Sequence, residues 1–200
     1  MRIHSLRLLP IIALAACLVS PGIAQAKLPD TKNTKIKPGK GMAGIKLDMT
    51  RAKVFDKWGK GKCVSEGEFC IWQRKKPSFS GEVETVTVSF YGSSRKVWQI
   101  ALAAAYTKQE GKLVPGALTK WKTSKNIHLG SKGTDVPAAY PAAEPHGGES
   151  GGYSLFQGSG QTARITDFNE RGFGASATRL GSIVVRWEAC HYLPDTPCPS

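Results

Sequence analysis

Apolar residues recur at helical spacing early in the chain. Val54, Phe55 and Trp58 fall on one side of a helix that winds at about 3.6 residues per turn. Thr50 is suited to precede the first turn, because Ser and Thr are common N-cap residues, and Gly59 is a natural C-terminal stop. The pattern therefore predicts one short amphipathic helix between these two residues.

After this helix the hydrophobic period changes to two, which is typical of strands that are buried on one side. Three strands are predicted in this way, over residues 69–73, 83–91 and 97–103. The residues expected on a common apolar side are Val86, Val88 and Phe90 in the second strand, and Trp98, Ile100 and Leu102 in the third. Sequential strands joined by a tight turn predict an antiparallel meander, whose apolar side must be covered by the helix.

Part of this pattern returns 82 residues further along the chain. At this offset Ile45 falls on Ile127, Leu47 on Leu129, Val54 on Val136, and Trp58 on Tyr140. Pro137 would interrupt a helix that began at Ser131, so the second helix is predicted to begin after Thr134, with the proline in its first turn. Three more strands are predicted over residues 153–157, 163–168 and 182–187. Internal repetition of this kind indicates two copies of one structural unit.

These elements predict an α+β fold of two tandem repeats, each a short helical element packed on an antiparallel meander of three to four strands. The first repeat is expected over residues 44–105 and the second over residues 117–190, with a further short helix at residues 117–123 leading into it. Residues 106–116 contain glycine and proline and are predicted to be a linker. The remaining segments are a signal peptide (1–26), a basic flexible arm (27–43) and a tail (191–200).

The N-terminus has the pattern of an export signal. Basic residues precede the apolar run from Leu8 to Val19, and Ala24-Gln25-Ala26 is a small-residue cleavage site. Leu14-Ala15-Ala16-Cys17 resembles a bacterial lipobox, in which Cys17 would be acylated and would become the mature N-terminus. Cleavage after Ala26 is favoured because the apolar run continues past Cys17. The protein is therefore expected to be secreted or periplasmic, with a lipid anchor at Cys17 as the alternative.

Four cysteines follow the signal, in two close pairs. An even count in an oxidising compartment indicates two disulfides, for which three connectivities exist. Local pairing needs no assumption about the fold, so we expect Cys63 to pair with Cys70 and Cys190 with Cys198. Zinc sites usually have cysteine pairs two to four residues apart, whereas these are seven and eight apart, which argues against a metal.

Positive charge is concentrated near the N-terminus. The formal net charge of the whole chain is +13, and residues 27–62 hold 11 Lys and Arg against 3 Asp and Glu. The arm begins at Lys27, and its candidate binding lysines are Lys32, Lys35, Lys37 and Lys40. Such an arm can attract an anionic partner over a long range, or it can be a solvated tail. No aromatic residues alternate with these lysines as a base-stacking surface needs, and exported proteins seldom meet nucleic acid, so a nucleic acid partner is not expected.

Catalytic signatures are missing from the sequence. His128, His146 and His191 do not form a pair at metal-ligand spacing. Glu82 and Glu84 fall on one side of a strand, but paired acids define a site only inside a cleft, and these two are predicted at an exposed hairpin edge. The sequence therefore predicts a protein that is not an enzyme and that has no cofactor.

In both copies the sequence Ile-x-Leu is followed by Gly or Asp and then by Met or Ser. It leads into a short helix that ends in Gly or Tyr-Pro, and a meander follows. Over residues 44–187 this arrangement resembles the tandem-repeat scaffold of β-lactamase inhibitory proteins and the related single-repeat outer-membrane assembly lipoproteins. The resemblance implies two helix-on-sheet units with their strands side by side, which leaves a concave sheet face free. In the inhibitors that face grips another protein. A bridge from Cys63 to Cys70, just after the helix, is also similar to that family.

The outward side of the meanders supplies the candidate binding residues. Phe156 is included because Tyr153 to Phe156 takes the place of Phe69 to Trp72 in the second unit. The full set is Trp72, Thr85, Thr87, Tyr91, Gln99 and Phe156. The functional hypothesis is an exported, non-enzymatic protein-binding or inhibitor-like module. The alternative is an envelope structural protein, or a lipoprotein involved in outer-membrane maintenance.

Overall fold

The computed structural model of the chain describes residues 26–74, 83–93, 95–106, 113–114, 116–147, 151–159, 163–171 and 179–188. The predictions for the signal peptide, for Glu82, for His191 and for the tail lie outside these residues, as does the predicted bridge between Cys190 and Cys198.

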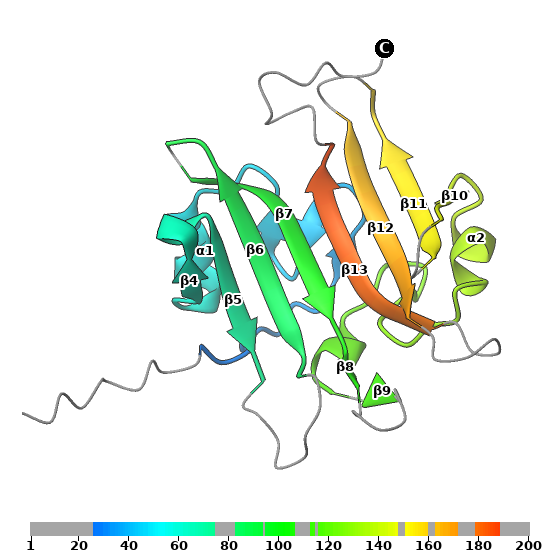
Figure 1. Cartoon of the computed structure of the whole chain (residues 1–200), viewed down its shortest axis with the longest axis horizontal. Helices are drawn as coiled ribbons and strands as arrows, with labels where there is room; N and C mark the ends of the chain where they lie inside the picture. Colours follow the sequence, from blue (N-terminus) through cyan, green and yellow to red (C-terminus); the bar gives the residue numbers. More distant parts are fainter. Residues whose placement is uncertain are drawn as a thin grey trace, which may run out of the picture.

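One antiparallel sheet of eight strands dominates the described chain (Figure 1). Its strand order is β10-β11-β12-β13-β7-β6-β5-β4. The bounds are Lys62–Val64 for β4, Phe69–Gln73 for β5, Thr85–Tyr91 for β6, Lys96–Ala103 for β7, Glu144–Pro145 for β10, Gly152–Gln157 for β11, Arg164–Arg171 for β12 and Arg179–Trp187 for β13. The six predicted strands are therefore confirmed, and the fold is mostly antiparallel β structure with few helices in its described part.

The two halves of the sheet meet at the pair β7 and β13. Ile100 lies opposite Val185 and Leu102 lies opposite Ile183 in this pair. From it the strands run outward in reverse chain order on both sides, to β4 at one edge and to β10 at the other. The first and second halves of the chain thus share one continuous sheet instead of forming separate layers.

Two short α-helices lie where the positions of Gly59 and Pro137 predicted them. Helix α1 (Arg51–Trp58) follows Thr50 and stops at Gly59, whose positive φ of 76° suits a residue without a side chain. Helix α2 (Asp135–Ala139) follows Thr134 and holds Pro137 inside its short span. Neither threonine side chain makes a capping hydrogen bond within the described residues. The helix predicted at residues 117–123 is reduced to the 3₁₀ turn η2 (Leu118–Lys120), and a second such turn, η1, spans Ser65–Gly67.

Both helices cover the same side of the sheet, where the core lies. Strand register aligns one row of buried side chains across six strands: Trp72, Val86, Leu102, Ile183, Phe168 and Tyr153, of which Tyr153 is partly exposed. The Trp58 ring of α1 packs edge-on against Trp72, with 5.5 Å between the ring centroids. Tyr140, which follows α2, stacks on Phe168 at 5.8 Å. Each helix therefore covers the half of the sheet that follows it in the chain.

The predicted flexible arm is ordered where it was expected to be mobile. Residues 36–46 form a small antiparallel sheet of β1 (Ile36–Lys37), β2 (Gly41–Met42) and β3 (Ile45–Lys46). Ile36 and Met42 are only 2% and 1% exposed, and the Gly39 amide donates a 2.8 Å hydrogen bond to Thr166 Oγ1 of β12. The prediction of a flexible arm is therefore wrong for this stretch, because its few apolar residues dock into a core supplied by distant strands.

The β6 and β7 pairing contains a bulge that changes one predicted face. Ser89 lies opposite Gln99 while Phe90 lies opposite Val97, so Trp98 is an extra residue without a cross-strand partner. Val97, which is fully buried, takes the core position that strict alternation assigned to Trp98. The prediction that Trp98 shares a face with Ile100 and Leu102 is thus wrong, although Trp98 is partly buried against the core.

Glu84 is also placed differently from the prediction. Its side chain is completely buried, and its two carboxylate oxygens accept hydrogen bonds from the backbone amides of Ala117 and Leu118 at 3.0 and 2.8 Å. The expectation of an exposed hairpin edge is wrong for this residue, because the carboxylate binds the free amides at the start of η2. Residues 105–114, within and beside the predicted linker, contribute the short paired strands β8 (Ala105–Tyr106) and β9 (Leu113–Val114).

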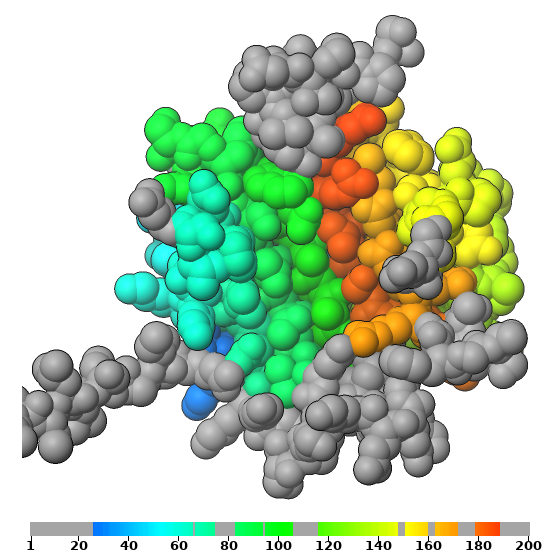
Figure 2. Space-filling view, viewed as in Figure 1, coloured from blue at the N-terminus to red at the C-terminus, as the bar shows by residue number. Residues whose placement is uncertain are grey.

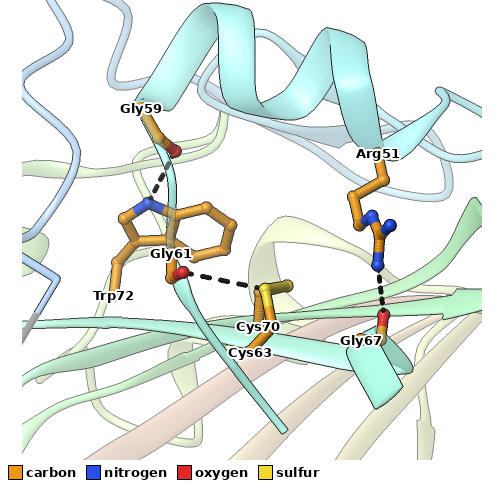
Figure 3. Close-up of a disulfide and its surroundings, with 7 residues drawn as sticks. All are labelled: Arg51, Gly59, Gly61, Cys63, Gly67, Cys70 and Trp72. Atoms are coloured by element: carbon orange, nitrogen blue, oxygen red, sulfur yellow. Dashed lines mark hydrogen bonds between the residues drawn. A yellow bond between two sulfur atoms is a disulfide. The ribbon is translucent and has the colours of Figure 1, made fainter. Parts of the chain in front are cut away.

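The predicted local disulfide joins Cys63 and Cys70. These residues lie directly opposite each other on β4 and β5, so the bridge ties the edge strand to its neighbour (Figure 3). Beside it the Trp72 indole packs over Gly61, where an added Cβ would come within 2.8 Å of the ring. The indole Nε1 donates a 3.2 Å hydrogen bond to the Gly59 carbonyl. The end of α1, the disulfide and Trp72 therefore form one packed unit.

Candidate functional site

The side of the main sheet opposite α1 and α2 is called the open face here. Because side chains alternate along a strand, the register fixes which residues lie on it. The central row is Ile71, Thr87, Ala101, Val184, Asp167 and Ser154, and beside it runs a row of Phe69, Ser89, Gln99, Arg186, Ile165 and Phe156. A third row consists of Gln73, Thr85, Ala103, Ser182, Asn169 and Gly152. Figure 2 views this side: strands of both halves are visible, and residues 26–50 are nearly hidden behind them.

Four of the predicted binding residues lie on the open face: Thr85, Thr87, Gln99 and Phe156. Phe156 is the most exposed of the large hydrophobic side chains that the structure describes, at 46%. Tyr91 continues the alternation of Thr85 and Thr87 at the end of β6, and its hydroxyl donates a 2.8 Å hydrogen bond to Asp48 Oδ1. The register therefore brings residues of both halves together on one surface.

Trp72 does not belong to this face, and its selection as a binding residue was wrong. Its side chain is 0% exposed and packs against α1, because β5 turns Cys70 and Trp72 inward and Ile71 outward. Phe156, its counterpart in the predicted repeat, points the opposite way. In β11 Leu155 faces the core and its neighbours Ser154 and Phe156 face the other side, so the two strands differ by one residue in register.

The charged groups within the three rows neutralise each other. Arg186 Nε donates to Asp167 Oδ2 at 2.8 Å, and Ser154 Oγ donates to the other oxygen, Oδ1, at 2.7 Å. Both acceptors of the carboxylate are thereby occupied. All other members of the three rows are uncharged, although the whole chain carries a formal net charge of +13. The three rows are therefore neutral overall and consist mainly of hydroxyl, amide, small aliphatic and aromatic groups; Ser154, Ile165 and Asp167 are buried, so the accessible part lies mainly on β5, β6, β7 and β13 and at Phe156.

The hydrogen bonds of the described serine and histidine side chains on and near this face are as follows. Ser154 Oγ donates to Asp167 and not to a histidine, and the ring of His146 packs against Gly152 of the third row, where an added Cβ would lie 3.0 Å from its Cε1 and Nε2. His128 Nδ1 instead lies 2.7 Å from the Leu129 carbonyl oxygen. In the described part of the chain, no cluster of three or more His, Cys, Asp or Glu side chains is arranged to hold a metal ion.

Three of the four predicted arm lysines come together around a pocket of about 410 Å³ on the other side of the sheet. Lys35, Lys37 and Lys40 line it, whereas Lys32 does not. Sequence reasoning missed two further cationic residues in its wall, Lys46 and Arg164. Lys46 belongs to the repeat lead, and Arg164 reaches the pocket from β12, so only the fold could reveal its contribution.

Among the described helices, none combines the length and the apolar character needed to cross a membrane. Comparison of the chain with protein-family models, with curated proteins and with solved structures finds no match. The geometry of the open face is therefore the basis on which a function can be proposed.

Proposed function

We propose that this chain is an exported, non-enzymatic protein-binding module, and that the open face is its binding surface. One observation carries the proposal: strands β5–β7 and β11–β13 have no described helix over this side and hold only one charged pair in the three rows, while Lys62 of β4 and Glu144 of β10 lie at the two ends of the central row, in a strongly basic chain. Solvated faces of antiparallel sheets usually carry polar and charged side chains. The centres of protein–protein interfaces are instead depleted in charge and enriched in aromatic residues.

The size of the face is suitable for such a partner. Six strands at about 4.8 Å spacing and five residues at about 3.4 Å each give roughly 500 Å² of sheet area. A standard interface buries about 800 Å² on each partner, so the accessible part of the three rows can supply up to about half of one. The remaining area would come from the rim of the sheet.

The side chains specify the chemistry of the partner surface. Ala101, Thr87 and Val184 form a shallow centre of small groups, and Phe69 and Phe156 lie at the two ends of the neighbouring row. A loop with an aromatic or aliphatic tip and few charges fits this centre. A strongly charged partner surface would lose hydration there without gaining a counter-charge.

We also infer that the two halves of the chain are copies of one helix-on-sheet unit. The support is the 82-residue echo, the placement of α1 before β4–β7 and of α2 before β10–β13, and the meeting of the two halves at β7 and β13. The resemblance to β-lactamase inhibitory proteins implies the same use of the sheet face. Export is supported by the signal-like N-terminus and by the disulfide, which is typical of oxidising compartments.

The proposal is tested by affinity capture from the native exported fraction with the wild type, Thr87→Glu and Ala52→Glu. Thr87 lies on the open face and Ala52 is exposed on α1, so both variants add one negative charge but on opposite sides of the sheet. We expect a partner that is retained at high salt and is lost only with Thr87→Glu. Equal retention by both variants, with unchanged thermal unfolding, would refute the proposed surface.

A further inference from the structure

The basic pocket lies on the opposite side of the sheet from the open face. Its wall is built from residues 33–48 and from Arg164, whose side chain points to the same side as Thr166 and Phe168 because strand residues alternate. Its volume of about 410 Å³ is within the range of small-molecule sites, which is roughly 300–1,000 Å³. The pocket is therefore independent of the surface proposed for the protein partner.

The cations of this pocket outnumber its acids by five to one. The lining contains Lys35, Lys37, Lys40, Lys46 and Arg164, with Asp48 as its one carboxylate. Asp48 Oδ1 already accepts a hydrogen bond from the Tyr91 hydroxyl. No ion pair joins any of the five cations to an acidic residue in the described chain. The described residues thus leave their mutual repulsion uncompensated, which favours an anion in their midst.

The lysines converge because the backbone beneath them is fixed by the core. Ile36 and Ile45 are 2% and 1% exposed, and strand alternation then turns the next residues, Lys37 and Lys46, outward. The turn between β2 and β3 is tight, with positive φ at both of its central residues, Ala43 and Gly44. These lysines therefore extend from an anchored platform and not from a mobile tail.

Arg164 supplies a second, separate indication. Its guanidinium carbon lies 4.5 Å from the centroid of the Trp187 ring, a cation–π arrangement that holds the group in place. Its Nε is shielded from solvent and has no hydrogen-bond acceptor among the described residues. An arginine held against an aromatic ring, with no ion pair to an acidic residue in the described part of the chain, is prepared for an oxyanion.

We propose that this pocket binds a phosphorylated group, either on a soluble molecule or on a lipid headgroup. Several lysines and one arginine suit a ligand with two or more negative charges, and arginine forms paired hydrogen bonds to phosphate oxygens. The pocket is large enough for a phosphate monoester together with the sugar or glycerol that carries it. Carboxylate ligands with one charge would neutralise only a fraction of the site.

Inorganic pyrophosphate is the soluble probe, titrated into the full mature chain by calorimetry at 50 mM and 300 mM salt. Lys37→Ala/Lys46→Ala removes two charges from the pocket, and Lys53→Ala/Lys57→Ala removes two from the exposed side of α1. We expect at least a tenfold weaker affinity for the pocket variant and less than a twofold change for the helix variant. Equal weakening by both would show a general positive field and would overturn the site. Arg164→Lys, which keeps the charge, is expected to weaken binding less than Arg164→Gln.

Vesicle flotation separates the two sources of the phosphate. Phosphatidylglycerol–phosphatidylcholine vesicles are compared with pure phosphatidylcholine vesicles, with the same two double variants. Flotation that depends on phosphatidylglycerol and is lost only in the pocket variant assigns a lipid headgroup. Pyrophosphate binding without flotation assigns a soluble ligand. A wild-type chain that binds neither probe would refute the proposal, and this outcome leaves the open-face proposal untouched because the two sites share no residue.

Discussion

The buried carboxylate of Glu84 gives the most quantitative prediction. This side chain is 0% exposed and accepts two backbone hydrogen bonds, from Leu118, the first residue of η2, and from Ala117 just before it. Glu84→Gln keeps the size of the side chain but leaves one oxygen, so one of the two amides faces an NH₂ group. Removing an acceptor from a buried donor costs about 1–3 kcal/mol, and the remaining bond loses its charge assistance.

Two smaller effects adjust this magnitude. Arg74 Nη1 lies 3.9 Å from the carboxylate, but its side chain is 48% exposed, so the ion pair is screened and adds little. The amide also avoids the cost of burying a charge, which offsets part of the loss. We therefore expect Glu84→Gln to lower the free energy of unfolding by about 2 kcal/mol.

The assay is urea unfolding followed by tryptophan fluorescence, with Glu68→Gln as the matched control. Glu68 is exposed and its side chain makes no ion pair among the described residues, so its variant should stay within about 0.5 kcal/mol of the wild type. Hydrogen exchange at the amides of Ala117 and Leu118 should accelerate in Glu84→Gln alone. A Glu84→Gln protein as stable as the control, with unchanged exchange, would refute the capping role.

Three further predictions concern the core, the disulfide and pH. Trp72→Ala should cost about 3–5 kcal/mol in urea unfolding, because a fully buried indole is removed; a loss below 1 kcal/mol would contradict its core position. Cys63→Ser/Cys70→Ser should lower stability by about 2.5 kcal/mol, from the entropy of an eight-residue loop, and unchanged unfolding would count against the bridge. Burial, together with the hydrogen bond to Asp48, raises the pKa of Tyr91 to about 12. The folded state then holds a proton that the unfolded state releases above pH 10, so stability should fall between pH 10 and 12, and less so in Tyr91→Phe; identical pH profiles would contradict the contact.

Local signals made the helices predictable. Gly59 stops α1 and Pro137 confines α2 through backbone properties that act within one turn. The alternation in β6 also identified its buried side, because threonine and valine differ clearly in polarity. In these elements the local sequence preference and the observed structure agree.

The wrong predictions concern residues whose position depends on a contact with a distant part of the chain. They also concern stretches in which all neighbouring residues are apolar. In β5, Phe69 to Trp72 are all apolar, so nothing in their composition distinguishes the buried Trp72 from the outward Ile71. The bulge at Trp98 depends on pairing with β6. Ile36 is buried where its amide donates a hydrogen bond to the carbonyl of Lys122, 86 residues away in the chain.

The candidate sites also contain some residues that could be predicted from the sequence and others that could not. Thr85, Thr87 and Gln99 could be predicted for the open face, because alternation within one hairpin determines their side. The neutral Asp167 and Arg186 pair could not be predicted, since it needs the register between β12 and β13. The same is true of the meeting of β7 and β13 that makes the face continuous.

Site-specific photocrosslinking in cells that export the protein tests the central claim most directly. A benzoylphenylalanine placed at Thr87 reports on the open face, and one placed at Ala52 reports on the exposed side of α1. We expect a discrete crosslink to another protein from Thr87 and none from Ala52. Crosslinks of equal yield from both positions, or from Ala52 alone, would contradict the assignment of the open face as the protein-binding surface.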